Sequence, residues 1–309
     1  MSPVFRFAPS PNGHLHLGHA CSALINAELA RRTGGRFLVR IEDIDTTRCR
    51  EELVEACLED LAWLGLQWEE PVLRQSTRFP AYRAVAETLE GEGLLYPCFC
   101  TRGEIIRATG PLAPRDPDGA TLYPGTCRGL DAAERARRLA AGEAFALRLD
   151  MARALAGRAE APLGWIEGGL PGTGPERRVP ADPAAWGDCI LIRKEIPASY
   201  HLAVVLDDAL QGVTHVVRGQ DLFAATAVHR LLQEQLGLPA PRYWHHPLIA
   251  GPDGKKLSKS LASKPLRQYR AEGASPAEIR VLAGIDRLLD ESHGHRDGER
   301  HGEDGEQRR

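Results

Sequence analysis

Two short stretches, far apart in the sequence, carry side chains suited to binding a polyphosphate. The first is His16-Leu17-Gly18-His19, which follows a proline-rich turn and continues at helical spacing. Backbone N–H groups at the start of a helix favour an anion, and a glycine lets a ligand approach the backbone closely. The second is Lys256-Leu257-Ser258-Lys259-Ser260, a cationic loop that would stabilise a departing polyphosphate. Each stretch taken alone also fits a solvated loop.

An acidic run follows the predicted strand at 36–41. It reads Glu42-Asp43-Ile44-Asp45. Ligands of open α/β sheets bind outside the carboxyl ends of the strands, so Glu42 is a candidate substrate contact. The alternative is that these acids cap the next helix, a role that suits Asp45 or Thr46.

Three cysteines and a tyrosine form a candidate metal site. Cys98 and Cys100 are separated by one residue, and Cys127 lies four residues after Tyr123. Zinc favours four tetrahedral ligands, most often thiolates or imidazoles. No histidine lies between Cys98 and Cys127, so the fourth ligand would be the Tyr123 phenolate, another oxygen or water. Three unrelated thiols are the alternative reading.

A sheet with covering helices is needed to position these residues. Apolar alternation and short apolar runs predict strands, and 3.6-residue periodicity predicts helices. The first expected strand begins at Phe5, and the others cover 36–41, 145–149, 189–192, 203–206 and 213–217. The expected helices cover 17–33, 48–64, 78–95, 221–236 and 275–289, the last opened by a capping box, Ser275-Pro-Ala-Glu278. The predicted fold class is α/β.

Shifts in composition divide the chain into five parts. Residues 1–95 form the first half of the α/β domain, and 186–260 form its second half, ending in the lysine–serine loop. Between them, residues 96–185 are rich in glycine, proline and arginine and are predicted to form an inserted subdomain with the candidate metal site. A short helical extension covers 261–290. The polar segment 291–309 has the composition of a disordered tail.

Composition excludes several classes of protein. The 309 residues are 43% hydrophobic and 26% charged, with a net charge of −3, as in ordinary soluble domains. No apolar run is long enough to span a membrane, and the first strand starts too early for a signal peptide. Seven cysteines, an odd number, fit reduced thiols better than a disulfide framework. We therefore expect a cytoplasmic monomer that has no membrane partner.

Together, the two polyphosphate stretches resemble a pair of known signatures. His16-Leu-Gly-His19 resembles the HIGH signature and Lys256-Leu-Ser-Lys-Ser260 the KMSKS signature of class I aminoacyl-tRNA synthetases. Each departs from the pattern at one apolar position. The resemblance implies a Rossmann-like catalytic domain that uses ATP with Mg²⁺. It further implies that His16, Gly18, His19 and Lys259 bind ATP, and that His16, His19, Lys256 and Lys259 take part in catalysis.

The surrounding motifs resemble the glutamate branch of that family. They are Arg6-Phe-Ala-Pro-Ser-Pro, Arg40-Ile-Glu-Asp-Ile-Asp, Tyr200-His-Leu-Ala and Val217-Arg-Gly-Gln-Asp-Leu. Glutamate has two carboxylates and one ammonium, which call for cationic or hydroxyl donors and one acid. The implied glutamate-binding residues are Arg6, Phe7, Ala8, Pro9, Ser10, Glu42, Tyr200 and Arg218. The same resemblance implies one structural zinc ion on Cys98, Cys100, Tyr123 and Cys127.

The expected acceptor follows from the short C-terminal region. Only 49 residues follow Ser260, too few for the anticodon-reading domains of a full glutamyl-tRNA synthetase. The short form resembles the glutamyl-Q tRNA(Asp) synthetase family, which implies activation of L-glutamate without tRNA and transfer to queuosine at the wobble position of tRNA(Asp). Three alternatives stay open: a glutamyl-tRNA synthetase fragment charging a tRNA 3′ end, a small adenylate-forming ligase, and a non-enzymatic paralogue that binds tRNA or amino acid.

Overall fold

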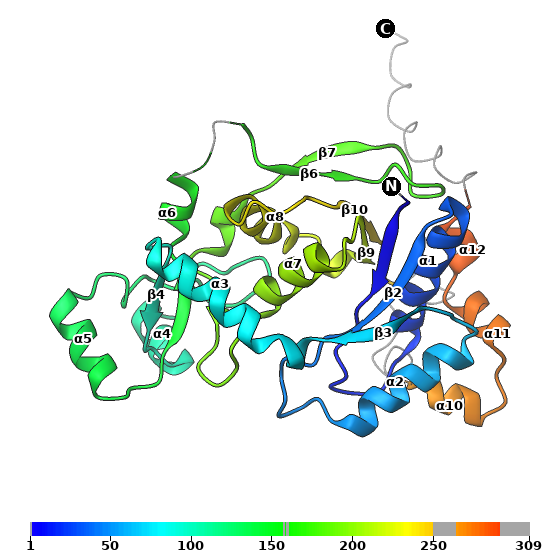
Figure 1. The fold of residues 1–309 in the computed structure, drawn as a ribbon, viewed down its shortest axis with the longest axis horizontal. Coiled ribbons are helices and arrows are strands. Elements are labelled where there is room, and N and C mark those ends of the chain that lie inside the picture. The colour runs from blue at the N-terminus through cyan, green and yellow to red at the C-terminus, as the bar shows by residue number, and fades with distance from the viewer. Residues whose placement is uncertain (1, 157, 159–160, 250–263, 291–309) are drawn as a thin grey trace, which may run out of the picture.

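A seven-stranded sheet forms the centre of the molecule (Figure 1). The computed structural model describes residues 2–156, 158, 161–249 and 264–290. The strand order is β3-β2-β1-β9-β10-β6-β7, and all neighbours pair in parallel except the β6–β7 hairpin. Its strands are β1 (Val4–Phe7), β2 (Arg36–Ile41), β3 (Glu69–Arg74), β6 (Gly164–Glu167), β7 (Arg177–Pro180), β9 (His215–Gly219) and β10 (Arg242–His246).

A second, antiparallel sheet has the order β4-β5-β8. Its strands are β4 (Leu95–Cys98), β5 (Ala146–Leu149) and β8 (Ile190–Ile192). The expected division of the chain does not coincide with the division between the two sheets. The β6–β7 hairpin lies within residues 96–185 and yet extends the main sheet beside β10, while β8, beyond residue 185, pairs with β5. Composition could not indicate this exchange, because pairing partners are far apart in the sequence.

Helices cover the main sheet and connect the two sheets. The α-helices are α1 (Leu17–Thr33), α2 (Glu51–Trp63), α3 (Phe79–Gly91), α4 (Arg102–Thr109), α5 (Ala132–Ala140), α6 (Met151–Ala156), α7 (Tyr200–Leu210), α8 (Thr226–Gln235), α10 (Leu266–Ala271), α11 (Pro276–Leu282) and α12 (Ile285–Leu288). The 3₁₀ helices are η1 (Gln75–Arg78), η2 (Pro183–Trp186) and η3 (Gln220–Leu222). In the described part of the chain, no helix has both the length and the apolar character to cross a membrane.

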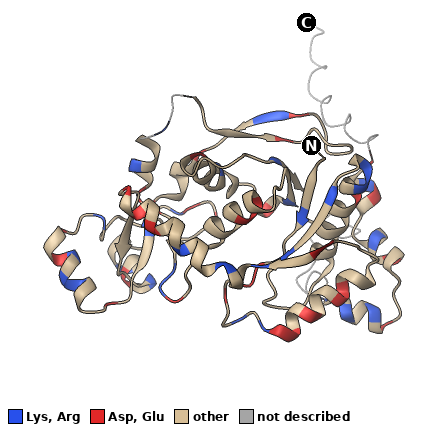
Figure 2. Cartoon of the chain, viewed as in Figure 1, with Lys and Arg blue, Asp and Glu red and all other residues tan. Residues whose placement is uncertain are grey.

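Two large apolar clusters hold these layers together. One packs α1, α2 and the C-terminal helices against β1 and β2. The other joins α3, β4, β5 and α6 to α7 and α8, so it links the small sheet to the main domain. Figure 2 shows acidic residues along α2 and basic residues on neighbouring α10, where Arg270 approaches Glu59 at 3.7 Å. The site described below lies between elements that these two clusters fix.

One predicted strand is wrong. Residues 203–206 lie inside α7, which begins after Ser199, whose hydroxyl accepts the Leu202 amide at 3.4 Å. The helix is buried between neighbouring layers, so Ala203, Val204 and Val205 are all apolar and show no helical periodicity. A short, continuous apolar run cannot distinguish a buried strand from a buried helix. Strands β3, β4, β6, β7 and β10 were not predicted, because polar residues, aromatic residues or proline interrupt their apolar pattern.

The predicted C-terminal helix is confirmed at its start and divided near its end. Ser275 and Glu278 form the expected capping box at the start of α11. Gly284 has φ of +68°, a left-handed conformation that favours glycine, so the chain turns there and α12 starts anew. Both helices pack on α1. The tail at 291–309 lies outside the described residues.

Candidate active site

A cleft of about 450 Å³ opens at the carboxyl ends of β1, β2, β9 and β10. From β1 the chain continues to β2 and β3 on one side, whereas β9 and β10 lie on the other, which makes this the switch point of the sheet. The structure brings together, along this cleft, all the residues predicted to bind glutamate and three of those predicted to bind ATP: Arg6, Phe7, Ala8, Pro9, Ser10, His16, Gly18, His19, Glu42, Tyr200 and Arg218. Lys256 and Lys259 lie outside the described residues.

Sequence reasoning missed other residues that line the cleft. They are Ser22, Val217, Gly219, Asp221, Leu222, His246, Leu248 and Ile249. Most lie at or just after the ends of β9 and β10, so recognising β10 as a strand would have indicated His246 and the residues after it. The Ser22 hydroxyl lies 2.7 Å from Nε2 of His246, which joins α1 to β10 at the rim. Leu248 and Ile249 add apolar surface on that side.

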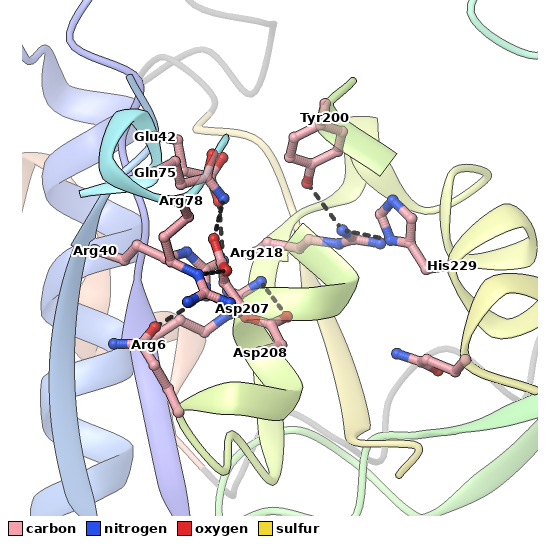
Figure 3. A network of polar contacts seen from close by, with 12 residues as sticks. Arg6, Arg40, Glu42, Gln75, Arg78, Tyr200, Asp207, Asp208, Arg218 and His229 are labelled. Atoms are coloured by element: carbon pink, nitrogen blue, oxygen red, sulfur yellow. Dashed lines mark hydrogen bonds and ion pairs between the residues drawn. The ribbon is translucent and has the colours of Figure 1, made fainter. Parts of the chain in front are cut away.

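Two arginines and two acids form a buried network beneath the cleft (Figure 3). Arg6 donates from Nε and Nη2 to the two Asp208 oxygens, at 3.0 and 3.3 Å. Arg40 donates from Nη1 to Asp208 at 2.7 Å and from Nη2 to Glu42 at 2.9 Å. These side chains come from β1, β2, the loop after β2 and α7. The network therefore fixes the floor of the cleft, and Glu42 lies at its open end.

The two acids of this network differ in how readily they ionise. Burial opposes the ionisation of Asp208, but the two guanidinium groups that contact it outweigh burial and lower its pKa. Burial raises the pKa of Glu42, because only Arg40 donates to it directly and Arg6 acts from farther away. Asp208 is thus the fixed counter-ion of the arginines. Glu42 is an acid that a cationic ligand group would keep ionised.

A second anchor holds α7 from its other side. Asp207, fully buried, accepts hydrogen bonds from Gln75 at 3.0 Å, Arg78 at 2.7 Å and the Tyr82 hydroxyl at 2.6 Å. Neighbouring acids on one helix thus bind different sets of donors. The position of Asp208 beneath the cleft is fixed by this packing as well as by its own bonds.

Arg218, in contrast, is a buried cation with neutral direct partners. It is 5% exposed. It donates to the Tyr200 hydroxyl at 3.1 Å and to Nδ1 of His229 at 3.3 Å (Figure 3). It also contacts Nε2 of His245, the Thr226 hydroxyl and the Leu222 carbonyl. Among the described residues no carboxylate pairs with it directly. A buried charge of this kind favours an anionic ligand, since burial without a counter-charge is costly.

The residues predicted to bind ATP lie at the start of α1, at one end of the cleft. Nδ1 of His16 accepts the Gly18 amide at 3.1 Å, and Nδ1 of His19 accepts the His16 amide at 3.2 Å. Burial lowers the pKa of both, that of His19 to about 4 with help from His16. Both imidazoles are therefore neutral near pH 7, with the proton on Nε2. A Cβ on Gly18 would lie 2.9 Å from Cε1 of His16, so any other residue there would require the His16 ring to shift.

The four predicted metal ligands, three cysteines and Tyr123, lie together, away from this cleft. The Sγ atoms of Cys98, Cys100 and Cys127 are all within 4.8 Å of one another, and the Tyr123 hydroxyl is 3.6 Å from Cys100. Burial opposes ionisation of Cys127, but hydrogen bonds from Tyr123 and the Phe99 amide outweigh it and lower its pKa. Three thiols in a largely buried group, one of them inclined to ionise, could hold a metal ion.

Comparison with known proteins finds several similar chains. Residues 4–295 match the family of tRNA synthetases class I (E and Q), catalytic domain. The glutamyl-Q tRNA(Asp) synthetase of Rhodobacter capsulatus is 48% identical over 91% of this chain and 100% of its own length. That of Symbiobacterium thermophilum is 42% identical over 93% and 87%. A solved glutamate tRNA ligase from Elizabethkingia meningosepticum, in complex with its amino acid, matches with a TM-score of 0.72 and 28% identity. The match covers 92% of this chain and 60% of that structure.

The buried network gives a test of stability. Asp208→Asn leaves Arg6 and Arg40 without their shared counter-ion, so we expect the free energy of unfolding to fall by about 3–5 kcal/mol. The control is Glu69→Gln, which removes the partner of Arg36 in a pair whose side chains are about half exposed. That loss should be about 0–1 kcal/mol. Denaturant unfolding followed by circular dichroism measures both. Equal, small losses would contradict the account of the network.

Proposed function

We propose that this chain uses ATP to activate L-glutamate in the absence of tRNA, and then transfers the glutamate to queuosine at the wobble position of tRNA(Asp). The chain belongs to the catalytic-domain family of class I tRNA synthetases for glutamate and glutamine, which are ligases. The fit between one cleft and one amino acid carries the proposal. Arg6 and Arg218 offer two cations for two carboxylates, and Glu42 offers one acid for one ammonium. Tyr200 adds a hydroxyl donor beside Arg218.

The state of each group supports this assignment. Arg218 and Arg6 both lie at the cleft, but Arg6 is already paired with Asp208, whereas Arg218 has only neutral direct partners. The more demanding carboxylate contact therefore falls to Arg218. Glu42 is bound through one oxygen to Arg40, and an ammonium beside it would offset the burial that raises its pKa. Ser10, Ala8 and the rest of the loop after β1 form the adjoining wall.

Activation would take place where this pocket meets the start of α1. An oxygen of the glutamate α-carboxylate attacks the α-phosphorus of Mg·ATP, and pyrophosphate leaves. Neutral His16 and His19 can donate from Nε2 to phosphate oxygens, and the N-terminus of α1 favours their charge. By resemblance, Lys256 and Lys259 would stabilise the leaving pyrophosphate. Positioning and preorganised donors supply most of the catalysis, with no covalent enzyme intermediate.

The acceptor part of the proposal rests on the relatives. In the second step a hydroxyl of queuosine attacks the acyl carbon of glutamyl-adenylate, and AMP leaves. Two similar proteins, 48% and 42% identical and matched over most of their length, bear the name glutamyl-Q tRNA(Asp) synthetase. The similarity to a solved glutamate tRNA ligase favours a second candidate acceptor, the 3′ end of a tRNA. Both candidates share the first step.

The cysteine group is proposed to hold one structural zinc ion. Cys98 ends β4, and a metal on Cys98, Cys100 and Cys127 would tie that strand to the segment near Tyr123. The Tyr123 hydroxyl is the proposed fourth ligand. Arg148 lies over the Tyr123 ring at 3.9 Å and holds it against the cysteines. A closed set of four ligands fits a structural site better than a catalytic one.

The zinc proposal is tested by metal analysis. Purified protein should contain about one zinc ion per chain, and Cys100→Ser should lose most of it, because serine is a poor zinc ligand. Cys49→Ser, at a cysteine outside the group, is the control and should retain zinc. Tyr123→Phe should weaken retention against a chelator. Equal zinc in the wild type and Cys100→Ser would refute the assignment.

The proposed activity is tested by glutamate-dependent ATP–pyrophosphate exchange without tRNA. The wild type should exchange, and Arg218→Gln should lower kcat/KM for glutamate by at least about tenfold, the loss expected for a charged hydrogen bond. Arg242→Gln is the control, because Arg242 lies on the next strand and pairs with exposed Glu176. Lys259→Ala should abolish exchange. No exchange by the wild type would refute the enzyme proposal.

The acceptor is decided by charging purified tRNA(Asp) with and without queuosine. The proposal predicts that glutamate is transferred only to the queuosine-containing form. Charging of tRNA(Glu), or equal charging of both forms of tRNA(Asp), would contradict it and favour the tRNA 3′ end.

A further inference from the structure

A chain of hydrogen bonds connects Arg218 to an acid that does not line the cleft. Arg218 donates from Nε to Nε2 of His245 at 3.1 Å, and Nδ1 of His245 lies 2.9 Å from Oε2 of Glu167. The three residues come from adjacent strands β9, β10 and β6, and Arg218 and His245 are register partners. Glu167 is 5% exposed. A buried anion thus lies one imidazole away from the buried cation.

The donors and acceptors fix the tautomer of His245. A guanidinium can only donate, so Nε2 of His245 must accept and its proton must be on Nδ1, facing Glu167. Glu167 also accepts the backbone amide of His245 at 2.7 Å and the indole N–H of Trp165 at 2.8 Å. Three donors therefore hold this carboxylate in place. Although burial opposes its ionisation, these bonds lower the pKa of Glu167 below its ordinary value.

We propose that Glu167 is a positioning residue for substrate recognition. By holding His245 in place, Glu167 orients Arg218 and offsets its charge, and it does so without binding to the guanidinium itself. This inference rests on the proposed function. A carboxylate bound directly to Arg218 would compete with the carboxylate of the amino acid. Interposing a neutral imidazole keeps every direct partner of Arg218 uncharged: its N–H groups donate to neutral acceptors, so a ligand carboxylate would meet a charge that no other carboxylate contacts directly. Arg6, in contrast, is already bound to Asp208.

The other hydrogen-bond partners of Arg218 are also neutral acceptors. Nδ1 of His229 accepts from Arg218, so its proton is on Nε2, which lies 3.2 Å from Nδ1 of His201. The Tyr200 oxygen also accepts from Arg218, which leaves its own proton available for a ligand. The direct partners of the Arg218 guanidinium are thus neutral acceptors. Glu167 is the anion connected to the guanidinium through one of these partners, His245.

The kinetic test uses Glu167→Gln, which keeps the shape of the side chain. A carboxamide has one acceptor oxygen, so in either orientation it presents an NH₂ to one of the three donors and weakens the hold on His245. We expect KM for glutamate in pyrophosphate exchange to rise about tenfold, as for loss of a charge-assisted hydrogen bond, with KM for ATP within about twofold. The control is Asp188→Asn, an equally buried carboxylate (4% exposed) outside the cleft, which should change neither KM by more than about twofold. An unchanged KM for glutamate, or equal rises for both substrates, would overturn the proposal.

A second measurement needs neither a variant nor activity. ¹⁵N NMR of the imidazoles in the wild type should show His245 protonated at Nδ1 and unprotonated at Nε2. A proton on Nε2 would overturn the proposal even if Glu167→Gln failed to fold. Wild-type protein that lacks glutamate-dependent exchange but has the expected tautomer would instead refute the proposed function and leave the hydrogen-bonded chain intact.

Discussion

The pairing of buried charges beneath the cleft is the interaction on which the site depends. Arg6 and Arg40 come from neighbouring parallel strands, and their side chains converge on Asp208 of α7. Removing such charges from water is tolerated only when each finds a partner with good geometry. That requirement fixes β1, β2 and α7 relative to one another, and Asp207 reinforces it through Gln75, Arg78 and Tyr82. At the open end of the network, Glu42 lines the cleft.

The cleft combines groups whose charges are already balanced with one whose charge is not. Asp208 and Glu42 together offset the charges of Arg6 and Arg40, and His16 and His19 are neutral because of burial. Arg218 has neutral direct partners and reaches an anion only through His245. A ligand carboxylate beside Arg218 would complete the set. In the proposed function the amino acid supplies that carboxylate, and its ammonium beside Glu42 would offset the burial that raises the pKa of Glu42.

Much of the site could be predicted from the sequence, whereas its support could not. The residues at the ends of β1 and β2, and Arg218 within β9, were predicted because they belong to recognisable local patterns, whereas Gly219, Asp221 and Leu222 were not assigned to the site. Residues 203–206 were misassigned because this part of buried α7 is a short, continuous apolar run, which a buried strand would also show. The connection from Arg218 to Glu167 was beyond reach, since it depends on β6 and β10, which were not predicted, and on a hairpin contributed by the expected insertion. Local sequence patterns identify the side chains that line the cleft. The residues that support those side chains depend on the pairing of strands far apart in the sequence, which local patterns do not show.

The most direct measurement of the central claim is isothermal titration of the protein with L-glutamate and, separately, with L-glutamine. The two amino acids have nearly the same shape, but glutamine lacks the second carboxylate. If the unpaired charge of Arg218 selects the ligand, glutamate binds at one site per chain and glutamine binds at least about tenfold more weakly. Equal affinities for the two would contradict the account, because shape rather than the buried charge would then determine recognition.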